Sequence, residues 1–195
     1  MQHDASAQTK ASGRLIFLMG PSGSGKDSLI DAARTDLTAA GVEIARRVIT
    51  RSAEAKGEAA HGVTSERFAA MRAAGEFAMC WQANGLEYGI PAQVDKWLGQ
   101  GRSVLVNGSR AYLPEARSRY PDLLAVCLEV RPEVLRERLL ARGRETPLEV
   151  DQRLARSARL QAEPDSAVHR VDNSGALAAA VSALLELLRK EGLPI

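Results

Sequence analysis

The feature that most constrains the fold of this chain is an apolar run, Leu15 to Met19, that leads directly into a glycine-rich turn ending at Lys26. Glycines let successive backbone N–H groups converge on phosphate oxygens, and the N-terminus of the following helix adds partial positive charge. A turn that only joined a strand to a helix would not need the lysine. The order of strand, loop and helix therefore predicts nucleotide binding, with Lys26 on the β- and γ-phosphates. The predicted nucleotide-binding residues of the loop are Gly20, Pro21, Ser22, Gly23, Ser24, Gly25, Lys26, Asp27 and Ser28.

One position of the loop departs from the usual pattern. The residue after the lysine is normally Ser or Thr, whose hydroxyl binds Mg²⁺, but here it is Asp27, followed by Ser28. Adjacent helical residues point about 100° apart, so the two side chains cannot share one ligand position. We expect Asp27 to bind Mg²⁺ directly or through water. Ser28 as the ligand, and Asp27 as a carboxylate stabilised by the helix dipole, are the alternatives that the sequence leaves open.

Composition excludes several classes of protein. The chain has 195 residues, enough for one full-sized core, and its 26 basic and 24 acidic residues give a formal charge of +2. This balance offers no electrostatic case for a nucleic acid or an anionic membrane as partner. Residues 1–13 form a polar tail without a signal sequence, and no apolar stretch has spanning length, so we expect a cytoplasmic protein. The pair Cys80 and Cys127 predicts reduced core thiols, and a homodimer is an arrangement that the sequence leaves open.

Strand-like runs alternate with helical patterns along the chain, which predicts an α/β fold with a parallel sheet flanked by helices on both faces. The predicted strands cover residues 15–19, 44–49, 103–106 and 123–130. The predicted helices cover residues 26–40, 110–119, 132–142, 148–161 and 176–190. Pro132 suits a first helical turn, Gly41 follows the first helix as a stop, and Ser174 is a candidate cap for the last helix.

Two regions depart from this alternation. Residues 51–89 resemble an insertion with a short helix at 65–74 and short strands at 77–82 and 86–89 around an Asn84-Gly85 turn. Residues 143–148 are a polar break between two helices, with arginines on both sides. Phosphoryl-transfer enzymes need an acceptor site and a lid that excludes water, and these two regions are the natural candidates.

The order of several short motifs resembles that of the guanylate kinases from Arg14 onward. These motifs are the phosphate loop, Ile49-Thr50-Arg51, Gly57-Glu58, Gly75-Glu76-Phe77, Tyr88-Gly89, Arg138 to Gly143 and Asp172-Asn173. The resemblance implies a P-loop nucleoside-monophosphate-kinase-like domain at 14–195. It further implies an acceptor-binding insertion at about 50–90, a lid at about 138–156 and adenine packing near Asn173.

The acceptor region departs from guanylate kinases where those enzymes read the base. The alignment places Met79 where they carry a Glu, and Ile90 where they carry a Ser. Neither side chain can accept hydrogen bonds from guanine in their place. Each unpaired group of a buried guanine edge would cost about 1–3 kcal/mol. Guanylate is therefore predicted to be a poor acceptor.

A second family fits this region better. The GKDS form of the loop, Thr50-Arg51, His61, the segment Trp81 to Gly85, Tyr88-Gly89 and the segment Asn107 to Arg110 resemble the ribose 1,5-bisphosphate phosphokinases of bacterial phosphonate breakdown. That family makes 5-phosphoribosyl 1-diphosphate (PRPP) from ribose 1,5-bisphosphate and ATP. The resemblance implies a transferase that uses ATP and Mg²⁺ and a sugar phosphate as its partner.

The matched motifs supply candidate residues on both sides of the reaction. For catalysis these are Lys26 and the arginines of the predicted lid, Arg138, Arg142, Arg144 and Arg153, with Arg142 and Arg153 preferred. For the acceptor they are Arg51 and Arg110 as phosphate clamps, with His61, Tyr88, Asn107 and Ser109 beside them. Each has an ordinary structural alternative: a solvated charge for the arginines, an exposed loop position for His61, packing for Tyr88, and turn chemistry for Asn107 and Ser109. Trp81 and Trp97 are interpreted as packing residues.

Three other functions compete with this interpretation. The chain could be a guanylate kinase with unusual base contacts, or a kinase of another small phosphorylated metabolite. It could also be a guanylate-kinase-like binding module without catalysis. A module of that kind is expected to have a decayed phosphate loop, whereas Gly20, Gly25 and Lys26 are intact.

Overall fold

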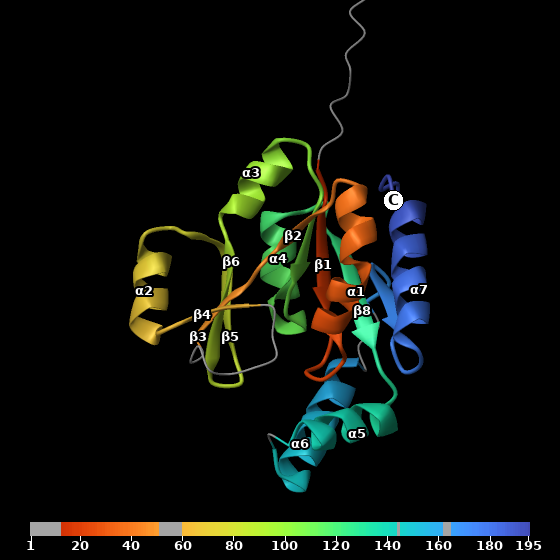
Figure 1. Cartoon of the computed structure of the whole chain (residues 1–195). Helices are drawn as coiled ribbons and strands as arrows, with labels where there is room; N and C mark the ends of the chain where they lie inside the picture. The colour runs from red at the N-terminus through yellow and green to blue at the C-terminus, as the bar shows by residue number, and fades with distance from the viewer. Residues whose placement is uncertain (1–12, 51–59, 144, 162–164) are drawn as a thin grey trace, which may run out of the picture.

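The computed structural model describes residues 13–50, 60–143, 145–161 and 165–195, and the structural statements below concern these residues. At its centre is a five-stranded sheet with the strand order β2-β7-β1-β8-β9 (Figure 1). Its strands are β2 (Glu43–Ala45), β7 (Val104–Asn107), β1 (Leu15–Met19), β8 (Leu124–Glu129) and β9 (Val168–Asp172). Every neighbouring pair is parallel, which confirms the predicted parallel α/β fold.

Strand β1 is buried on both faces because helices cover both sides of the sheet. Its side chains alternate: Ile16 and Leu18 pack in one apolar cluster, and Leu15, Phe17 and Met19 pack in the other. The first cluster includes residues of α1 (Lys26–Ala39) and α7 (Leu177–Lys190). The second includes residues of α3 (Gln93–Gly99) and α4 (Leu113–Arg119). Because helices cover both of its faces, a central strand such as β1 needs apolar residues at every position.

A second sheet lies beside the first and has the order β4-β3-β6-β5 (Figure 1). Its strands are β4 (His61–Val63), β3 (Val48–Thr50), β6 (Leu86–Pro91) and β5 (Phe77–Ala83), with α2 (Ser65–Ala73) at its outer side. Asn84 and Gly85 have φ values of 52° and 74°, which confirms the predicted tight turn between β5 and β6. On α2, Phe68 stacks on Phe77 with ring centroids 4.6 Å apart. The predicted insertion therefore supplies β4, β5 and most of β6 of a second sheet, whereas β3 lies just before it.

Helices α5 (Pro132–Arg142) and α6 (Pro147–Gln161) form a pair below the carboxyl ends of the central strands in Figure 1. Pro132 lies in the first turn of α5, where its missing N–H costs nothing. The pair has its own small core of Val130, Leu135, Leu139 and Val150. This helix pair matches the predicted helices on both sides of the polar break.

The predicted strand at 44–49 is wrong as a single element. It divides into β2 and β3, which belong to different sheets, and Arg46 and Arg47 lie between them. The run resembled one strand because each of the two short strands contributes buried apolar residues, Ala45 from β2 and Val48 and Ile49 from β3. The crossing from one sheet to the other depends on tertiary contacts that the local sequence does not report.

Other boundaries also differ from the predictions. The sequence did not indicate β4, α3 or β9, and the predicted helix at 110–119 begins with a 3₁₀ turn, Arg110–Tyr112, before α4. Ser174 does not cap α7, whose cap position is Ala176. The Ser174 hydroxyl instead accepts a hydrogen bond from the Arg131 N–H at 2.8 Å. Ser174 therefore links the end of β9 to the start of α5.

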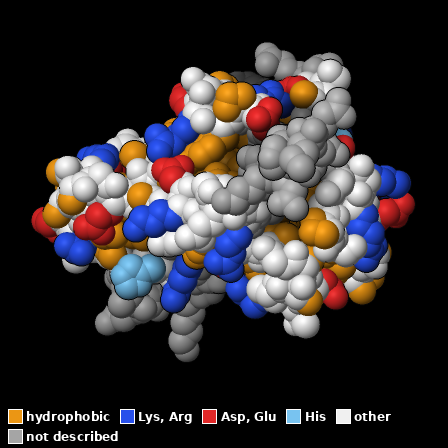
Figure 2. Space-filling view, turned by 90° about the horizontal axis from the view of Figure 1, so that it is seen from above, with side chains coloured by type: hydrophobic (Ala, Val, Ile, Leu, Met, Phe, Trp, Pro, Cys, Tyr) orange, Lys and Arg blue, Asp and Glu red, His pale blue; other side chains and the backbone are white. Residues whose placement is uncertain are grey.

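The face of the molecule seen in Figure 2, from above the view of Figure 1, carries both basic and acidic side chains, and basic side chains gather near its lower centre. Within the described part of the chain, no helix combines the length and the apolar character needed to cross a membrane. Both cysteines are free, with Cys127 buried and Cys80 partly exposed.

Candidate active site

A cavity of about 610 Å³ lies where the carboxyl ends of the central strands meet the second sheet and α5. This edge is where α/β sheets bind their ligands. The lining residues come from every part that the sequence assigned to phosphate transfer. They are Gly20, Ser22, Gly23, Gly25, Lys26, Asp27, Ser28, Arg47, Trp81, Ala83, Asn84, Tyr88, Gly108, Ser109, Arg138, Ala141, Arg142, Asn173, Gly175 and Leu177.

The phosphate loop forms one wall of the cavity. Gly25 precedes α1 with a φ of 87°, and a Cβ at this position would lie 2.7 Å from the Asn173 side-chain nitrogen. Glycine is therefore required there both by backbone conformation and by space. The Lys26 ammonium donates hydrogen bonds to the carbonyl oxygens of Gly20 at 2.8 Å and Pro21 at 3.1 Å. These bonds hold its charge over the loop, on the side that lines the cavity.

Asn173 joins the end of β9 to the phosphate loop. It is only 3% exposed, and its Nδ2 donates to the Ser24 carbonyl oxygen at 2.8 Å. Asn173 Oδ1 and Ser24 Oγ are buried polar atoms without a hydrogen-bond partner. Because buried polar atoms are normally paired, a ligand with hydrogen-bonding groups suits this corner. Asn173 also lines the cavity, as its predicted place near adenine requires.

The turn that carries Asn173 is held by the residues on either side of it. The Ser174 hydroxyl and then the Ser174 backbone N–H donate hydrogen bonds to Asp172 Oδ1. These bonds stabilise the carboxylate and lower the pKa of Asp172. The ionised Asp172 thus helps to fix the position of Asn173 beside the loop.

Asp27 points from the first turn of α1 toward the central sheet. Its Oδ1 accepts a hydrogen bond from Asn107 Nδ2 at 2.7 Å and lies 3.6 Å from Arg47 Nη2. Asn107, at the end of β7, is 3% exposed. Ser28 is exposed and also lines the cavity. Both candidate metal ligands are therefore within the site, and the choice between them stays a prediction.

The donor set fits Mg²⁺ bound together with a nucleotide. In the described ranges there is no group of three or more His, Cys, Asp or Glu side chains that could hold a metal ion. Mg²⁺ in kinase sites keeps several waters and uses only one or two protein ligands plus phosphate oxygens. A single Asp27 carboxylate at the cavity wall satisfies that requirement.

The opposite wall is built from the second sheet and the end of β7. Trp81 stacks on Tyr88 with centroids 5.7 Å apart and an angle of 6° between the planes, and it also packs on Tyr112. The Arg47 guanidinium lies 5.4 Å from the centre of the Tyr88 ring. Gly108 and Ser109 complete this wall beside the loop. We call Arg47, Trp81, Tyr88 and Ser109 the acceptor wall.

Met79 and Ile90 do not line the cavity. They are paired across β5 and β6, are 2% and 0% exposed, and belong to the apolar core cluster behind the wall. Neither offers a polar group to a base. The geometry therefore supports the interpretation that this site does not read guanine.

Two predicted acceptor residues lie away from the cavity in this structure. His61 is exposed on β4, not in a loop, and does not line the cavity. Arg110 donates from Nη2 to the sulfur of Cys127, so its guanidinium points into the central fold. Arg51 and Arg144 lie outside the described residues. Of the predicted acceptor residues, Tyr88 and Ser109 line the cavity, and Asn107 reaches it through Asp27.

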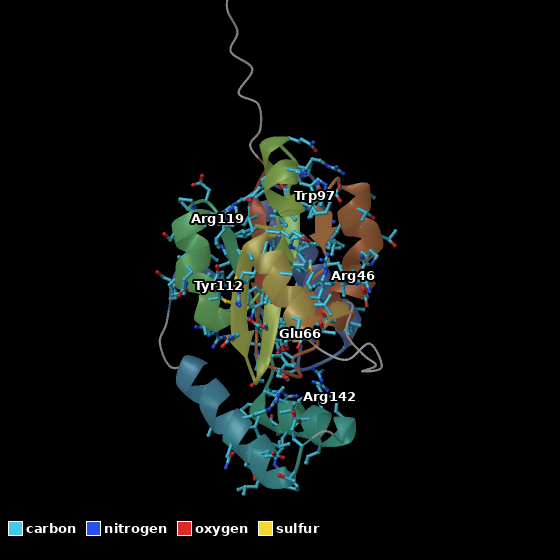
Figure 3. All side chains as sticks on the ribbon, turned by 90° about the vertical axis from the view of Figure 1, so that its left-hand side faces the viewer. Arg46, Glu66, Trp97, Tyr112, Arg119 and Arg142 are labelled. Carbon is cyan, nitrogen blue, oxygen red and sulfur yellow. The ribbon has the colours of Figure 1, made fainter. Side chains whose placement is uncertain are left out.

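The predicted lid arginines also divide into two groups. Arg138 and Arg142 line the cavity, and Figure 3 shows Arg142 on the side of α5 that faces the rest of the molecule. Arg138 Nη1 is buried without a hydrogen-bond partner, as expected of a guanidinium that awaits an anion. Arg153 instead pairs with Glu145 at 3.0 Å and does not line the cavity.

Among the charged residues that line the described cavity, Arg47 is the one that the sequence interpretation did not predict. Its side chain is 11% exposed, and it follows the exposed Arg46 in the connection between β2 and β3. Because residues 44–49 were predicted to form one strand, Arg47 was not expected to lie in a connection beside the cavity. Two adjacent arginines in the middle of an apolar run were the signal that could have indicated a break there.

The parallel sheet, the phosphate loop and the cavity between loop, second sheet and α5 define a P-loop kinase of the nucleoside-monophosphate-kinase type. Among solved structures, a guanylate kinase from Anaplasma phagocytophilum superposes with a TM-score of 0.66 over 93% of this chain and 87% of that one. The two sequences are 18% identical, so the likeness concerns the fold.

Sequence relatives identify the family within this class. The chain is 62% identical to a ribose 1,5-bisphosphate phosphokinase PhnN from Pseudomonas paraeruginosa, over 90% of this chain and 95% of the relative. It is 60% identical to the protein of the same name from Azotobacter vinelandii, over 91% of this chain and 97% of that one. No protein-family model matches the chain. The chain belongs to the ribose 1,5-bisphosphate phosphokinase PhnN family.

Proposed function

We propose that this protein transfers the γ-phosphoryl group of ATP to ribose 1,5-bisphosphate and forms 5-phosphoribosyl 1-diphosphate and ADP. The observation that carries the proposal is the acceptor wall itself. It presents Arg47, Tyr88 and Ser109 to the cavity, while Met79 and Ile90 are buried behind it. A cationic wall without base-reading groups suits an acceptor with phosphates and no base. The names of the close relatives point to the same substrate.

The nucleophile in this reaction is an oxygen of the phosphate on C1 of the acceptor. That oxygen bonds to the γ-phosphorus as the bond from this phosphorus to the β,γ-bridging oxygen breaks, and ADP leaves. Because the attacking phosphate is already ionised near neutral pH, no side chain has to remove a proton. Catalysis then consists of in-line positioning and the neutralisation of negative charge.

This chain supplies positive charge on two sides of the proposed reaction. Lys26 lies on the phosphate loop, and Arg138 and Arg142 reach the cavity from α5. We assign Lys26 to the β- and γ-phosphates, and the two arginines to the transferring group. When bound, Mg²⁺ would supply further charge neutralisation on the β- and γ-oxygens. Asp27, with Ser28 as the alternative, would hold it.

We assign the remaining parts by the same reasoning. The α5 and α6 pair is proposed to close over the cavity as a lid, since Arg138 and Arg142 of α5 already line the cavity together with the loop. The second sheet is proposed to hold the acceptor, and Asn173 to pack near adenine. Since ATP is the phosphoryl donor, we place the reaction in the cytoplasm. A homodimer stays a prediction.

A substrate panel tests the proposal. Purified protein is incubated with ATP, Mg²⁺ and, separately, ribose 1,5-bisphosphate, guanylate, other nucleoside monophosphates or ribose 5-phosphate, and products are identified by mass. We expect a product one phosphoryl group heavier than ribose 1,5-bisphosphate and very slow use of guanylate. Efficient transfer to guanylate without transfer to the sugar bisphosphate would return the chain to guanylate kinase activity.

A further inference from the structure

Arg47 has no role in the motifs that the sequence matched, yet it is one of the residues that form the acceptor wall. We propose that Arg47 binds the C1 phosphate of the acceptor, the group that attacks ATP, and thereby determines which phosphate reacts. This inference rests on the proposed function and assigns one residue of this chain to one group of the substrate.

The backbone of Arg47 is fixed at the joint between the two sheets. It follows β2 of the central sheet and precedes β3 of the second sheet, and its carbonyl oxygen accepts a hydrogen bond from the His61 N–H at 2.7 Å. With its backbone held on both sides, Arg47 directs its side chain into the cavity. The planar guanidinium itself is pre-organised, so less conformational entropy is lost for each hydrogen bond that it forms with an anion.

The side chain of Arg47 is arranged for anion binding. Its guanidinium lies over the Tyr88 ring, which is itself stacked on Trp81. This cation–π contact holds the guanidinium against the ring on the wall of the cavity. A planar guanidinium can donate two parallel hydrogen bonds to phosphate oxygens.

The position of Arg47 selects the phosphate. Its Nη2 lies 3.6 Å from Asp27 Oδ1, and Asp27 follows the loop lysine directly. Arg47 is therefore at the end of the acceptor wall that adjoins the phosphate loop. Only the phosphate that attacks the γ-phosphorus must lie at that end, because the transfer requires donor and acceptor oxygens in line. In ribose 1,5-bisphosphate this is the C1 phosphate.

Asp27 and Asn107 hold the Arg47 side chain beside the phosphate loop in the absence of substrate. Asn107 holds Asp27 Oδ1 at 2.7 Å, and the Asp27 carboxylate faces the Arg47 guanidinium. A carboxylate can offset the cost of keeping a mostly buried guanidinium charged, which the usual Ser or Thr hydroxyl could not do. We therefore assign Asp27 a second task, as a positioning residue for Arg47.

The other basic side chains of the described cavity lining belong to the phosphate loop and to α5. Among the described residues that line the cavity, the basic side chains besides Arg47 are Lys26 on the loop and Arg138 and Arg142 on α5. On the described part of the acceptor wall, Arg47 is thus the basic residue. Arg110, one of the two phosphate clamps that the motifs suggested, contacts Cys127 instead, and the other, Arg51, lies outside the described residues.

Two sugars with one phosphate each test the assignment. Binding of ribose 1-phosphate and of ribose 5-phosphate is measured by titration calorimetry, with the protein saturated by Mg²⁺ and a non-hydrolysable ATP analogue. For Arg47→Gln we expect ribose 1-phosphate to bind roughly 10- to 100-fold more weakly, the usual loss for a charge-assisted hydrogen bond. Ribose 5-phosphate should bind as it does to the unmodified protein. Arg47→Lys keeps the charge but not the planar fork, so its affinity for ribose 1-phosphate should lie between that of Arg47→Gln and that of the unmodified protein.

The neighbouring Arg46 supplies a matched control. It is exposed, is labelled in Figure 3, and donates to the Ala60 carbonyl oxygen at 3.1 Å. Arg46→Gln removes the same charge one residue away and should leave the affinity for both sugars unchanged. If Arg47→Gln unfolds at a lower temperature, Arg47→Lys carries the comparison.

Several outcomes would overturn the proposal. An equal loss for both sugars, a loss for ribose 5-phosphate alone, or an equal effect of Arg46→Gln would each remove Arg47 from the C1 phosphate. A matching loss of affinity for the ATP analogue would show a general structural role. These outcomes concern Arg47 alone and would leave the proposed function standing, because the substrate panel tests that function separately.

Discussion

The two walls of the cavity are built in opposite ways. The nucleotide wall is one contiguous segment, residues 20–28, with Asn173 added from β9. The acceptor wall draws Arg47, Trp81, Tyr88 and Ser109 from separate segments and two different sheets. A contiguous wall can be recognised from residue order, whereas a wall assembled from several strands depends on how those strands meet.

The walls also differ in what holds them. Backbone hydrogen bonds and the Lys26 and Asn173 side chains shape the nucleotide wall. Stacked aromatic rings and the Arg47 and Asp27 pair shape the acceptor wall. Changes in the first wall should therefore slow transfer to any acceptor. Changes in the second should alter which acceptor is used, or the stability of the sheet that carries it.

The largest effect is expected at the loop lysine. Lys26→Ala removes the charge that we assign to the β- and γ-phosphates, and we expect turnover to fall on the order of 10³-fold while the fold is kept. Steady-state rates with saturating ribose 1,5-bisphosphate measure the loss, and circular dichroism checks the fold. Lys190→Ala, which removes a lysine that is exposed and paired with Glu186, is the control. Turnover near that of the unmodified protein would refute the assignment of the loop.

Met79→Glu tests what lies behind the acceptor wall. Met79 is 2% exposed in an apolar cluster, so a carboxylate there should lower the free energy of unfolding by about 3 kcal/mol, measured by urea denaturation. Met79→Leu, of similar volume, should cost less than about 1.5 kcal/mol. If Met79→Glu were fully stable and used guanylate well, the residue would face the acceptor rather than the core.

The lid arginines should differ in importance. Arg142 lines the cavity, and Arg142→Ala is expected to lower kcat about 10²-fold because it removes the donor that we assign to the transferring group. Arg153 pairs with Glu145, so Arg153→Ala should lower kcat less than about tenfold. Rates at saturating ATP and acceptor compare the two variants. A greater loss for Arg153→Ala would show that closure of the lid brings Arg153 to the reaction.

The smallest effect concerns Asp172 at the end of β9. Because Ser174 lowers the pKa of Asp172 below its ordinary value of 3.8, this carboxylate stabilises the fold above that pH. Its contribution is lost as the pH falls through the lowered pKa of the folded state. We expect Asp172→Asn to cost less than about 1 kcal/mol at neutral pH, since the group is largely exposed. Urea denaturation from pH 7 to pH 2.5 should show the difference shrinking below pH 3.8, and a constant difference would contradict this origin.

Much of the fold followed from local pattern. The phosphate loop, the central strand β1 and the helices α1, α5, α6 and α7 agree with the predicted segments within a residue or two. Their signals are local, because a buried strand is uniformly apolar and a helix shows its period and its terminal residues. Short elements were less predictable. For example, β9 reads Val-His-Arg-Val-Asp and is an edge strand with exposed polar residues.

The candidate site was predictable on one wall and only partly on the other. Residues 20–28 and Asn173 line or support the cavity as expected. Tyr88 and Ser109 also reach it, but His61 and Arg110 do not, because β4 leaves His61 exposed and Arg110 turns to Cys127. A motif specifies which residue occurs at a position, whereas the direction of its side chain depends on the packing around it.

By itself, the sequence determined the phosphate loop, the α/β class and the loss of guanine-reading groups, because each is a property of residues close together in the chain or of a residue type at one position. Only the tertiary structure decided that Arg47, Asp27 and Asn107 meet at the joint of two sheets. That meeting requires β2 and β3 to part into different sheets, with β7 beside β2. Contacts between distant segments set that arrangement, because the buried surface that stabilises each sheet comes from elements far apart in the chain.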